Sequence, residues 1–347
     1  MFLHIVGARP QFMKLSPLYD EMVNKNLECK ILHTGQHFDT NMSDIFFEEL
    51  GIPKPHYNLN INSLSNTYMT SLMMKGIEDV LVNDNFHSVI VYGDTNSTLA
   101  GALVGRQLNL NVIHIESGVR NNDEVMPEET NRIITDRISD ILFCVSPDGV
   151  KNLQSEGCWY NSKIYCCGDL MYDSVLKFKK KSETLINNYG DYVLVTIHRA
   201  SNTDDKNILR EIVDNLNEIN KDIKVVFPIH PRTKNMISGM KIDFELIEPV
   251  GYVEMLNLIN NSKFVITDSG GVVRESYWFK KPSLLLLDKP LWPELIEMGV
   301  CVNTHPSSMM SGYNSIKENN FNFIEGIYGD GKTSEKITKH ILENMNE

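Results

Sequence analysis

The sequence predicts an α/β protein with two domains, each built around a parallel β-sheet. Short apolar runs that suit strands buried on both faces alternate with amphipathic helical patterns almost from end to end, which is typical of repeated βαβ units. The chain has 347 residues, more than the roughly 250–300 residues at which a single core stops growing. The apolar runs fall into two series. They are separated by a lysine-rich polar stretch at 178–188, which we interpret as a solvated helix or linker.

Five strands are predicted in the first series. They are Phe2–Val6, Cys29–His33, Ser88–Tyr92, Val112–Ile115 and Ile141–Cys144. Helical periodicity between these strands predicts three helices, at Asn66–Val82, Thr98–Leu108 and Pro127–Arg137. We assign residues 1–169 to the first domain and expect the connection between the domains near residues 168–191.

Five strands are also predicted in the second series. They are Tyr192–Ile197, Lys224–Ile229, Phe244–Ile247, Phe264–Thr267 and Ser283–Leu287. Helical periodicity predicts helices at Lys206–Asn220, Tyr252–Asn260 and Ser334–Met345. We assign residues 170–347 to the second domain, and expect its last segment, 334–347, to pack back on the first domain.

Composition excludes several classes of protein. The formal net charge of −12 argues against a general nucleic-acid-binding protein, because such binding needs clustered lysine and arginine. No apolar stretch approaches the roughly 18 residues that span a membrane. The six cysteines have no paired metal-ligand spacing, and the first residues lack a cationic leader. We therefore expect a soluble, cytoplasmic protein with reduced cysteines and no metal, nucleic-acid or membrane partner.

A candidate anion site follows the first strand. In open α/β sheets, ligands bind at the carboxyl ends of the strands. Gly7 permits a tight turn there, Pro10 suits the first turn of a helix, and Arg9 and Lys14 add positive charge to the helix N-terminus. The alternative is an ordinary turn with two solvated cations. The stretch matches neither the Walker nor the dinucleotide-binding glycine pattern, so it does not indicate ATP or NAD.

Two further strand ends carry an aspartate at the start of a helix. Asp94 follows one predicted strand, and the run from Asp268 through Ser269 to Gly270 and Gly271 follows another. Helix capping is the simpler interpretation of both aspartates. The two glycines, however, leave backbone N–H groups open at a helix start, which favours phosphate binding. One turn later, Glu275 is placed to accept hydrogen bonds from a ribose.

Acidic side chains gather after the fourth predicted strand. Glu116 ends a buried strand, where a carboxylate without a partner or a task is unfavourable. Glu128 opens a helix, with Arg132 one turn later, and the alternative for this pair is a surface ion pair. Together with Asp94, these carboxylates would supply both a base and an acid around one point.

Basic motifs end two strands of the second series. His198 and Arg199 follow one strand, and His230 follows another. A single histidine in such a place is more often structural. Two strand-terminal motifs of this kind favour a cationic rim instead.

Taken in order, these motifs resemble those of the non-hydrolysing UDP-N-acetylglucosamine 2-epimerases, over nearly the whole chain. The motifs are Arg9 to Lys14, Gly93 to Thr95, His114 to Gly118, Pro127 to Arg132, His198 with Arg199, and Asp268 to Gly271 with Glu275. The resemblance implies a glycosyltransferase-B-like fold, in which two Rossmann-like domains face a cleft. It also implies a UDP-sugar substrate, a homodimer, and no metal or nicotinamide cofactor.

The resemblance further implies a mechanism and a set of roles. A base removes the C2 proton as UDP leaves C1, and UDP re-adds to the 2-acetamidoglucal as a proton reaches the other face. Which carboxylate is the base stays open. The implied catalytic residues are Asp94, Glu116, Glu128 and His198. The implied UDP and substrate contacts are Arg9, Lys14, Arg132, Arg199, Ser269, Gly270, Gly271, Glu275 for the ribose and Tyr252 near the uracil, to which the strand-end argument adds His230.

Some positions depart from the family pattern. Many bacterial members bind a second, activating UDP-sugar through a Gln-His-Arg-Gln-Met stretch. The corresponding stretch of this chain, Gln36 to Thr40, reads Gln-His-Phe-Asp-Thr. We therefore expect activation by a second UDP-sugar to be weak or absent. Met126-Pro127 and 291–294 look closer to members that act on UDP-2,3-diacetamido uronates, which leaves the substituents at C3 and C6 open. The alternatives are a hydrolysing epimerase, a glycosyltransferase of the same fold and a non-catalytic nucleotide-sugar sensor.

Overall fold

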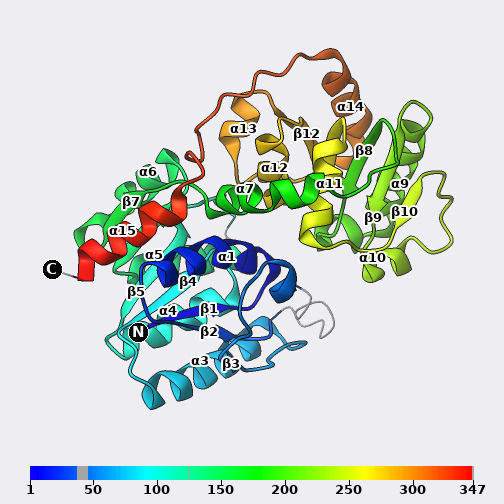
Figure 1. The fold of residues 1–347 in the computed structure, drawn as a ribbon. Helices are drawn as coiled ribbons and strands as arrows, with labels where there is room; N and C mark the ends of the chain where they lie inside the picture. Colours follow the sequence, from blue (N-terminus) through cyan, green and yellow to red (C-terminus); the bar gives the residue numbers. More distant parts are fainter. Residues whose placement is uncertain (37–45, 124, 346–347) are drawn as a thin grey trace. The chain divides into compact units, whose positions relative to one another are not determined.

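Two compact units make up the chain in a computed structural model that describes residues 1–36, 46–123 and 125–345. Unit 1 comprises Met1–Lys177 together with Gly326–Glu347, and unit 2 comprises Phe178–Glu325. The division falls within helix α7 (Leu170–Glu183), and the chain returns to unit 1 before helix α15 (Thr333–Met345) (Figure 1).

Unit 1 contains a seven-stranded sheet in the order β3-β2-β1-β4-β5-β6-β7, and every neighbouring pair is parallel. Its strands are β1 (Phe2–Val6), β2 (Cys29–His33), β3 (Tyr57–Asn58), β4 (Ser88–Tyr92), β5 (Asn111–Ser117), β6 (Ile141–Cys144) and β7 (Lys163–Cys166). Strands β1 and β4 are buried along their whole length, as continuous apolar runs in a parallel sheet require.

Helices cover both faces of this sheet. They are α1 (Arg9–Asn24), α3 (Asn66–Asn83), α4 (Asn96–Gln107), α5 (Pro127–Ile138), α6 (Pro147–Ser155), the 3₁₀ helix η1 (Cys158–Tyr160), the first part of α7, and α15. Apolar residues of α3 and α4 share one core with the inward side chains of β1 and β4. Helix α1 lies on the opposite face, and α15 packs beside it (Figure 1). Asp173 of α7 holds the start of α15 by accepting hydrogen bonds from the backbone N–H groups of Thr333 and Ser334.

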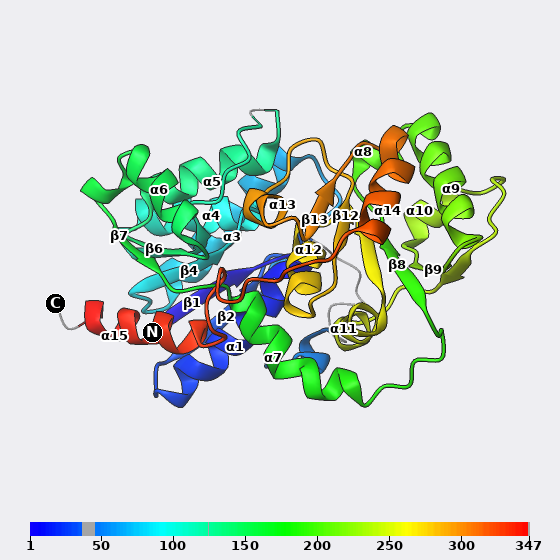
Figure 2. The same ribbon diagram turned by 90° about the horizontal axis from the view of Figure 1, so that it is seen from above.

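Unit 2 contains a six-stranded parallel sheet in the order β10-β9-β8-β11-β12-β13. Its strands are β8 (Tyr192–Thr196), β9 (Lys224–Pro228), β10 (Glu245–Ile247), β11 (Phe264–Thr267), β12 (Ser283–Leu285) and β13 (Cys301–Asn303). Its helices are α8 (Ala200–Thr203), α9 (Lys206–Asn220), α10 (Pro231–Met236), α11 (Tyr252–Asn261), α12 (Gly270–Trp278), α13 (Pro293–Glu297), η2 (Pro306–Ser308) and α14 (Met309–Glu318). Helix α14 lies beside α9, and both contribute to the main core of this unit (Figure 2).

Both sheets reverse their strand order at one point. In unit 1 the order switches between β1 and β4, and in unit 2 between β8 and β11. The crossover helices on either side of such a point lie on opposite faces, so the loops at the strand ends separate and leave room for a ligand. The first turn after each of these four strands is therefore the expected position of a binding residue.

The predicted α/β class and the parallel sheets are confirmed. All ten predicted strands are present, with shifts of one or two residues at some of their ends, whereas β3, β7 and β13 were not predicted. These three have two to four residues each and lie at sheet edges, where short strands lack a long apolar run. In the part of the chain that the structure describes, no helix is long and apolar enough to cross a membrane.

Candidate active site

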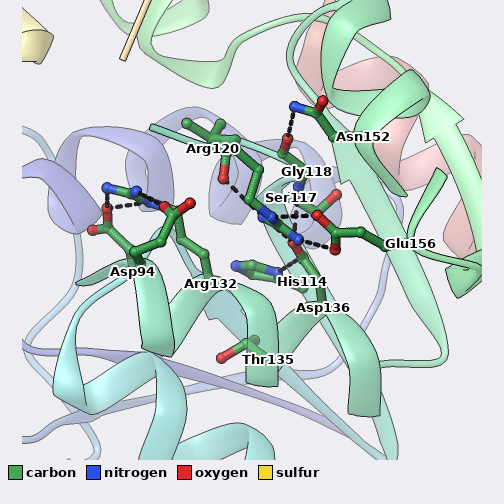
Figure 3. Close-up of polar contacts among 12 residues, drawn as sticks. Asp94, His114, Ser117, Gly118, Arg120, Arg132, Thr135, Asp136, Asn152 and Glu156 are labelled. Atoms are coloured by element: carbon green, nitrogen blue, oxygen red, sulfur yellow. Dashed lines mark hydrogen bonds and ion pairs between the residues drawn. The ribbon is translucent and has the colours of Figure 1, made fainter. Parts of the chain in front are cut away.

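Asp94 is oriented by an ion pair with a buried arginine. It follows β4 through Gly93, whose φ of 63° lies in the left-handed region. Its Oδ2 accepts hydrogen bonds from Arg132, at 2.9 Å from Nε and 2.7 Å from Nη2 (Figure 3). Arg132 is 2% exposed and also pairs with Glu129. Burial lowers the pKa of Arg132, but the charges of Asp94 and Glu129 outweigh it and raise that pKa overall.

The remaining oxygen of Asp94 stays available. Among the residues that the structure describes, Oδ1 of Asp94 has no hydrogen-bond partner. The capping interpretation of Asp94 is wrong, because Thr95 caps α4 by accepting a hydrogen bond from the N–H of Thr98. Asp94 is thus a fixed carboxylate with one open oxygen at the carboxyl end of a central strand.

Glu116 is turned out of its strand by a bulge. The register between β5 and β6 shifts between Ile115 and Ser117, and Glu116 has a φ of 68°, which is uncommon for a residue other than glycine. Bulges of this kind re-aim a side chain. The carboxylate lies 2.6 Å from Nζ of Lys14, and both side chains are largely buried. Lys14 also approaches the turn before Asp94, since a Cβ on Gly93 would lie 3.4 Å from its Nζ.

The other two predicted residues of unit 1 lie in different surroundings. The guanidinium of Arg9, at the first residue of α1, lies 4.2 Å from the ring centroid of Phe46. Glu128 is half-buried in the first turn of α5, and its side chain has no hydrogen bond or ion pair within the described residues. The alternative of a surface ion pair between Glu128 and Arg132 is wrong, because Arg132 is buried against Asp94 and Glu129 instead.

Two buried amides that sequence reasoning missed hold the turn around Asp94. Oε1 of Gln11 accepts hydrogen bonds from the N–H groups of Gly7 and Ala8, and its Nε2 lies 2.8 Å from the carbonyl of Tyr92. It thus ties the turn after β1 to the end of β4. Asn131 donates a hydrogen bond of 2.9 Å to the carbonyl of Asp94. In the sequence, only their positions within the motifs Arg9 to Lys14 and Pro127 to Arg132 pointed to these two amides.

Gln36 has a structural partner. Its Oε1 accepts hydrogen bonds from the backbone N–H and the hydroxyl of Ser97 in the first turn of α4. The rest of the stretch that predicts weak activation, 37–40, lies outside the described residues.

In unit 2, one buried carboxylate organises the strand ends at the switch point. Asp268 is fully buried and accepts hydrogen bonds from the N–H groups of His198 and Arg199 and from Asn202. It also lies 3.2 Å from Nδ1 of His198, whose side chain is 55% exposed. The capping interpretation of Asp268 is therefore wrong. Asp268, directly after β11, thus holds the turn that follows the neighbouring strand β8.

The first turn of α12 presents backbone N–H groups that have no acceptor among the described residues. Ser269 is the N-cap and accepts a hydrogen bond from the N–H of Val272. Gly270 and Gly271 follow as the first helical residues, and N–H groups at these positions have no partner within a helix. Such a turn can bind a phosphate through its backbone. A Cβ on Gly270 would lie 3.2 Å from Nε1 of Trp292, whereas a Cβ on Gly271 would make an ordinary contact, 3.7 Å from Oγ of Ser269.

The remaining predicted residues of unit 2 have mainly structural surroundings. His230 caps α10 through a ring nitrogen that accepts a hydrogen bond from the N–H of Arg232. Tyr252 is buried at the first residue of α11, with its ring edge-on to Phe178, and Glu275 is buried within α12. No group of three metal-ligating side chains occurs in the residues that the structure describes.

Comparison with known proteins identifies a family. The family model for UDP-N-acetylglucosamine 2-epimerase matches residues 21–342. A UDP-2,3-diacetamido-2,3-dideoxy-D-glucuronate 2-epimerase from Pseudomonas aeruginosa is 43% identical, over 98% of this chain and 99% of the relative. A UDP-N-acetylglucosamine 2-epimerase from Methanocaldococcus jannaschii is 38% identical, over 96% and 97%. The crystal structure of the M. jannaschii enzyme in complex with UDP-GlcNAc and UDP has a TM-score of 0.91 at 38% identity, covering 99% of this chain and all of that one.

Proposed function

Because the chain belongs to the UDP-N-acetylglucosamine 2-epimerase family, it is an isomerase, and we propose that it inverts C2 of a UDP-linked N-acetylhexosamine. One observation carries the proposal. At the carboxyl ends of the neighbouring strands β4 and β5, Asp94 and Glu116 are each held by a buried cation, Arg132 and Lys14. Two fixed carboxylates suit a reaction in which one proton is removed and another is delivered.

The chemistry requires a good leaving group. A proton on the carbon that bears an amide nitrogen is not acidic, so the C2–H bond breaks only as the C1–O bond to UDP breaks with it. The electron pair of C2–H becomes the C1=C2 double bond of a 2-acetamidoglucal, and the pair of C1–O leaves with UDP. Re-addition of UDP to C1 with protonation of C2 on the other face gives the epimer. We assign the proton transfers to Asp94, Glu116 and Glu128, without separating base from acid.

Positive charge stabilises the departing diphosphate in this scheme. We assign that role to Arg9, Lys14 and Arg132 in unit 1, and to His198 and Arg199 in unit 2. Preorganised donors of this kind stabilise developing negative charge without reorganisation during the reaction. The Asp268 carboxylate supports the assignment, because it fixes the backbone of both His198 and Arg199.

Unit 2 supplies the other proposed UDP contacts. The cap and first-turn N–H groups of Ser269, Gly270 and Gly271 would bind a phosphate, as helix N-termini do elsewhere. Glu275 would accept hydrogen bonds from the ribose, and Tyr252 would lie near the uracil. His230 would contribute to the diphosphate site through its exposed side.

The substituents at C3 and C6 define the substrate more closely. The relatives named above act on UDP-N-acetylglucosamine and on UDP-2,3-diacetamido-2,3-dideoxy-D-glucuronate. Both share the acetamido group at C2 and the C1–UDP bond, which are all that the proposed reaction uses. We propose that the substrate belongs to this class of UDP-sugars.

Proton NMR in deuterated water tests the function. A panel of UDP-sugars that differ at C3 and C6 is incubated with the enzyme, and the C2 proton signal is followed. An epimerase replaces that proton by deuterium while the sugar stays linked to UDP. Release of free sugar and UDP would indicate a hydrolysing enzyme, UDP release only with an acceptor would indicate a glycosyltransferase, and binding without exchange would indicate a sensor.

We also propose that the chain forms a homodimer, as the family resemblance implies. Light scattering coupled to size-exclusion chromatography measures the mass directly. A mass of two chains supports the proposal, and a mass of one chain contradicts it.

A further inference from the structure

A buried ion network lies behind the two strand ends that carry Asp94 and Glu116. His114 of β5 and Asp136 of α5 are both fully buried. Nδ1 of His114 lies 2.6 Å from Oδ1 of Asp136 (Figure 3), and its Nε2 lies 2.7 Å from the carbonyl oxygen of Gly93. Gly93 directly precedes Asp94, so the imidazole connects Asp136 to the turn that presents the first carboxylate.

Both ring nitrogens of His114 face oxygen acceptors. A carbonyl oxygen cannot donate, and Nδ1 faces a carboxylate, so the ring makes both hydrogen bonds only when each nitrogen carries a proton. Burial raises the pKa of the Asp136 carboxyl, but the His114 ring and the Arg120 guanidinium outweigh it and lower that pKa overall. A charged carboxylate between two cations accounts for these contacts.

The second oxygen of Asp136 holds the turn after Glu116. Oδ2 accepts a hydrogen bond of 3.1 Å from the N–H of Gly118 and lies 2.8 Å from Nη1 of Arg120. Arg120 is in turn held by Glu156, which accepts hydrogen bonds from its Nε and Nη2, each at 2.8 Å. Asp136 is therefore bonded to the turn that follows Glu116 and, through His114, to the turn that precedes Asp94.

The turn at Glu116 needs such support. Its φ of 68° lies in the left-handed region, which a residue other than glycine adopts only where its surroundings hold it. Gly93 and Gly118, with φ of 63° and 76°, adopt this region without that cost. Gly118 also packs closely on α6, since a Cβ there would lie 2.3 Å from the carbonyl oxygen of Gly149. A single carboxylate thus holds the constrained turn at Glu116 and, through His114, the turn at Gly93.

We propose that Asp136 is a positioning residue for both candidate carboxylates, acting on Asp94 through a doubly protonated His114 and on Glu116 through the N–H of Gly118. The proposal rests on the proposed function, in which Asp94 and Glu116 transfer protons. Asp136 itself touches neither substrate nor reacting atoms. Its effect should therefore appear in the rate of the chemical step rather than in the affinity for the UDP-sugar.

Asp136→Asn tests the effect on catalysis. The amide keeps the size of the carboxylate but cannot pair with two cations, and it presents an N–H to Nδ1 of His114. Because a misplacement of about 1 Å can cost about 10²-fold in rate, we expect kcat for C2 exchange to fall by about 10- to 100-fold, with KM for the UDP-sugar within about threefold of wild type. Asp140→Asn is the matched control. Asp140 lies just after α5, is half-buried, pairs with Arg106 and accepts a hydrogen bond from the N–H of Val112 in β5. It contacts neither turn, and the amide oxygen of asparagine can still accept from Val112, so kcat should stay at the wild-type value.

A measurement on the unmodified protein covers the case in which Asp136→Asn does not fold. In a sample labelled with nitrogen-15 in histidine, the His114 ring should show two N–H signals, identified by their absence in His114→Gln. A single N–H signal in the wild type would overturn the proposal. Wild-type kcat in a folded Asp136→Asn variant would overturn it while leaving the epimerase function in place. Absence of C2 exchange in the wild type would overturn the proposed function, and this proposal with it.

Discussion

Acid should destabilise unit 1 through one of its buried histidines, His4. This residue lies in the middle of β1 and is fully buried. Its Nδ1 lies 2.6 Å from the hydroxyl of Tyr92 at the end of β4, and its Nε2 has no hydrogen-bond partner among the described residues. Burial lowers the pKa of His4 to about 3, because a charged ring there would lose its water.

The sign and size of the effect follow from linkage. In the unfolded chain His4 takes up a proton below its ordinary pKa of 6.5, whereas the folded protein resists protonation until about pH 3. The unfolded state therefore binds more protons across this window, and the free energy of unfolding falls as the pH falls. The full shift corresponds to about 5 kcal/mol at about 1.4 kcal/mol per pKa unit, of which about 2.5 kcal/mol is lost between about pH 7 and about pH 4.5.

Urea unfolding followed by circular dichroism at these two pH values measures the loss. The double variant His4→Phe with Tyr92→Phe removes the titrating ring and its hydroxyl partner together, which avoids an unsatisfied buried group. It should lose about 2.5 kcal/mol less than the wild type on acidification. His305→Asn, at an exposed ring, controls for removal of one histidine and should keep the wild-type loss. An equal loss in the wild type and the double variant would refute the reasoning.

Three further perturbations test other parts of the account. Asp94→Asn and Glu116→Gln should each lower kcat for C2 exchange by about 10²-fold or more with the fold intact. The control Asp148→Asn, which removes an exposed partner of Lys151, should leave kcat unchanged. Wild-type exchange in both site variants would mean that these carboxylates are structural. Arg132→Met should lower the free energy of unfolding by about 3 kcal/mol, because it leaves the buried Glu129 without its cation, and a urea midpoint equal to that of the wild type would contradict this. Gly270→Ala should destabilise unit 2 by about 1–2 kcal/mol, because the new Cβ would lie too close to Trp292. Gly271→Ala should not cause this loss, because a Cβ there makes only an ordinary contact. Equal melting temperatures for the two variants would show that Trp292 moves aside without cost.

The sequence was most informative where burial is continuous. Strands such as β1 and β4 are mostly apolar and are buried along their whole length, and the residues after them occupy the carboxyl edge of the sheet by topology alone. For this reason Asp94 and Glu116 could be located from the sequence. Strands β3 and β13 have two and three residues, too few to show periodicity.

The partners of the site residues could not be predicted, because they come from distant parts of the chain. Asp268 bonds to the backbone of His198 and Arg199 about seventy positions away, and Gln11 reaches the end of β4 from α1. The bulge at Glu116 likewise depends on the pairing of β5 with β6. From position alone, capping was the simpler interpretation of Asp94 and Asp268, while the structure gives the capping role to the next residue in each case.

Cleavage of the bond between C1 and UDP is the central claim, and positional isotope exchange tests it most directly. The UDP-sugar is prepared with oxygen-18 in the bridge between C1 and phosphorus, and the position of the label is read by phosphorus NMR as C2 inverts. If UDP leaves and returns, the label spreads from the bridge into the non-bridging positions of that phosphate. Inversion of C2 with the label still confined to the bridge would contradict the elimination mechanism.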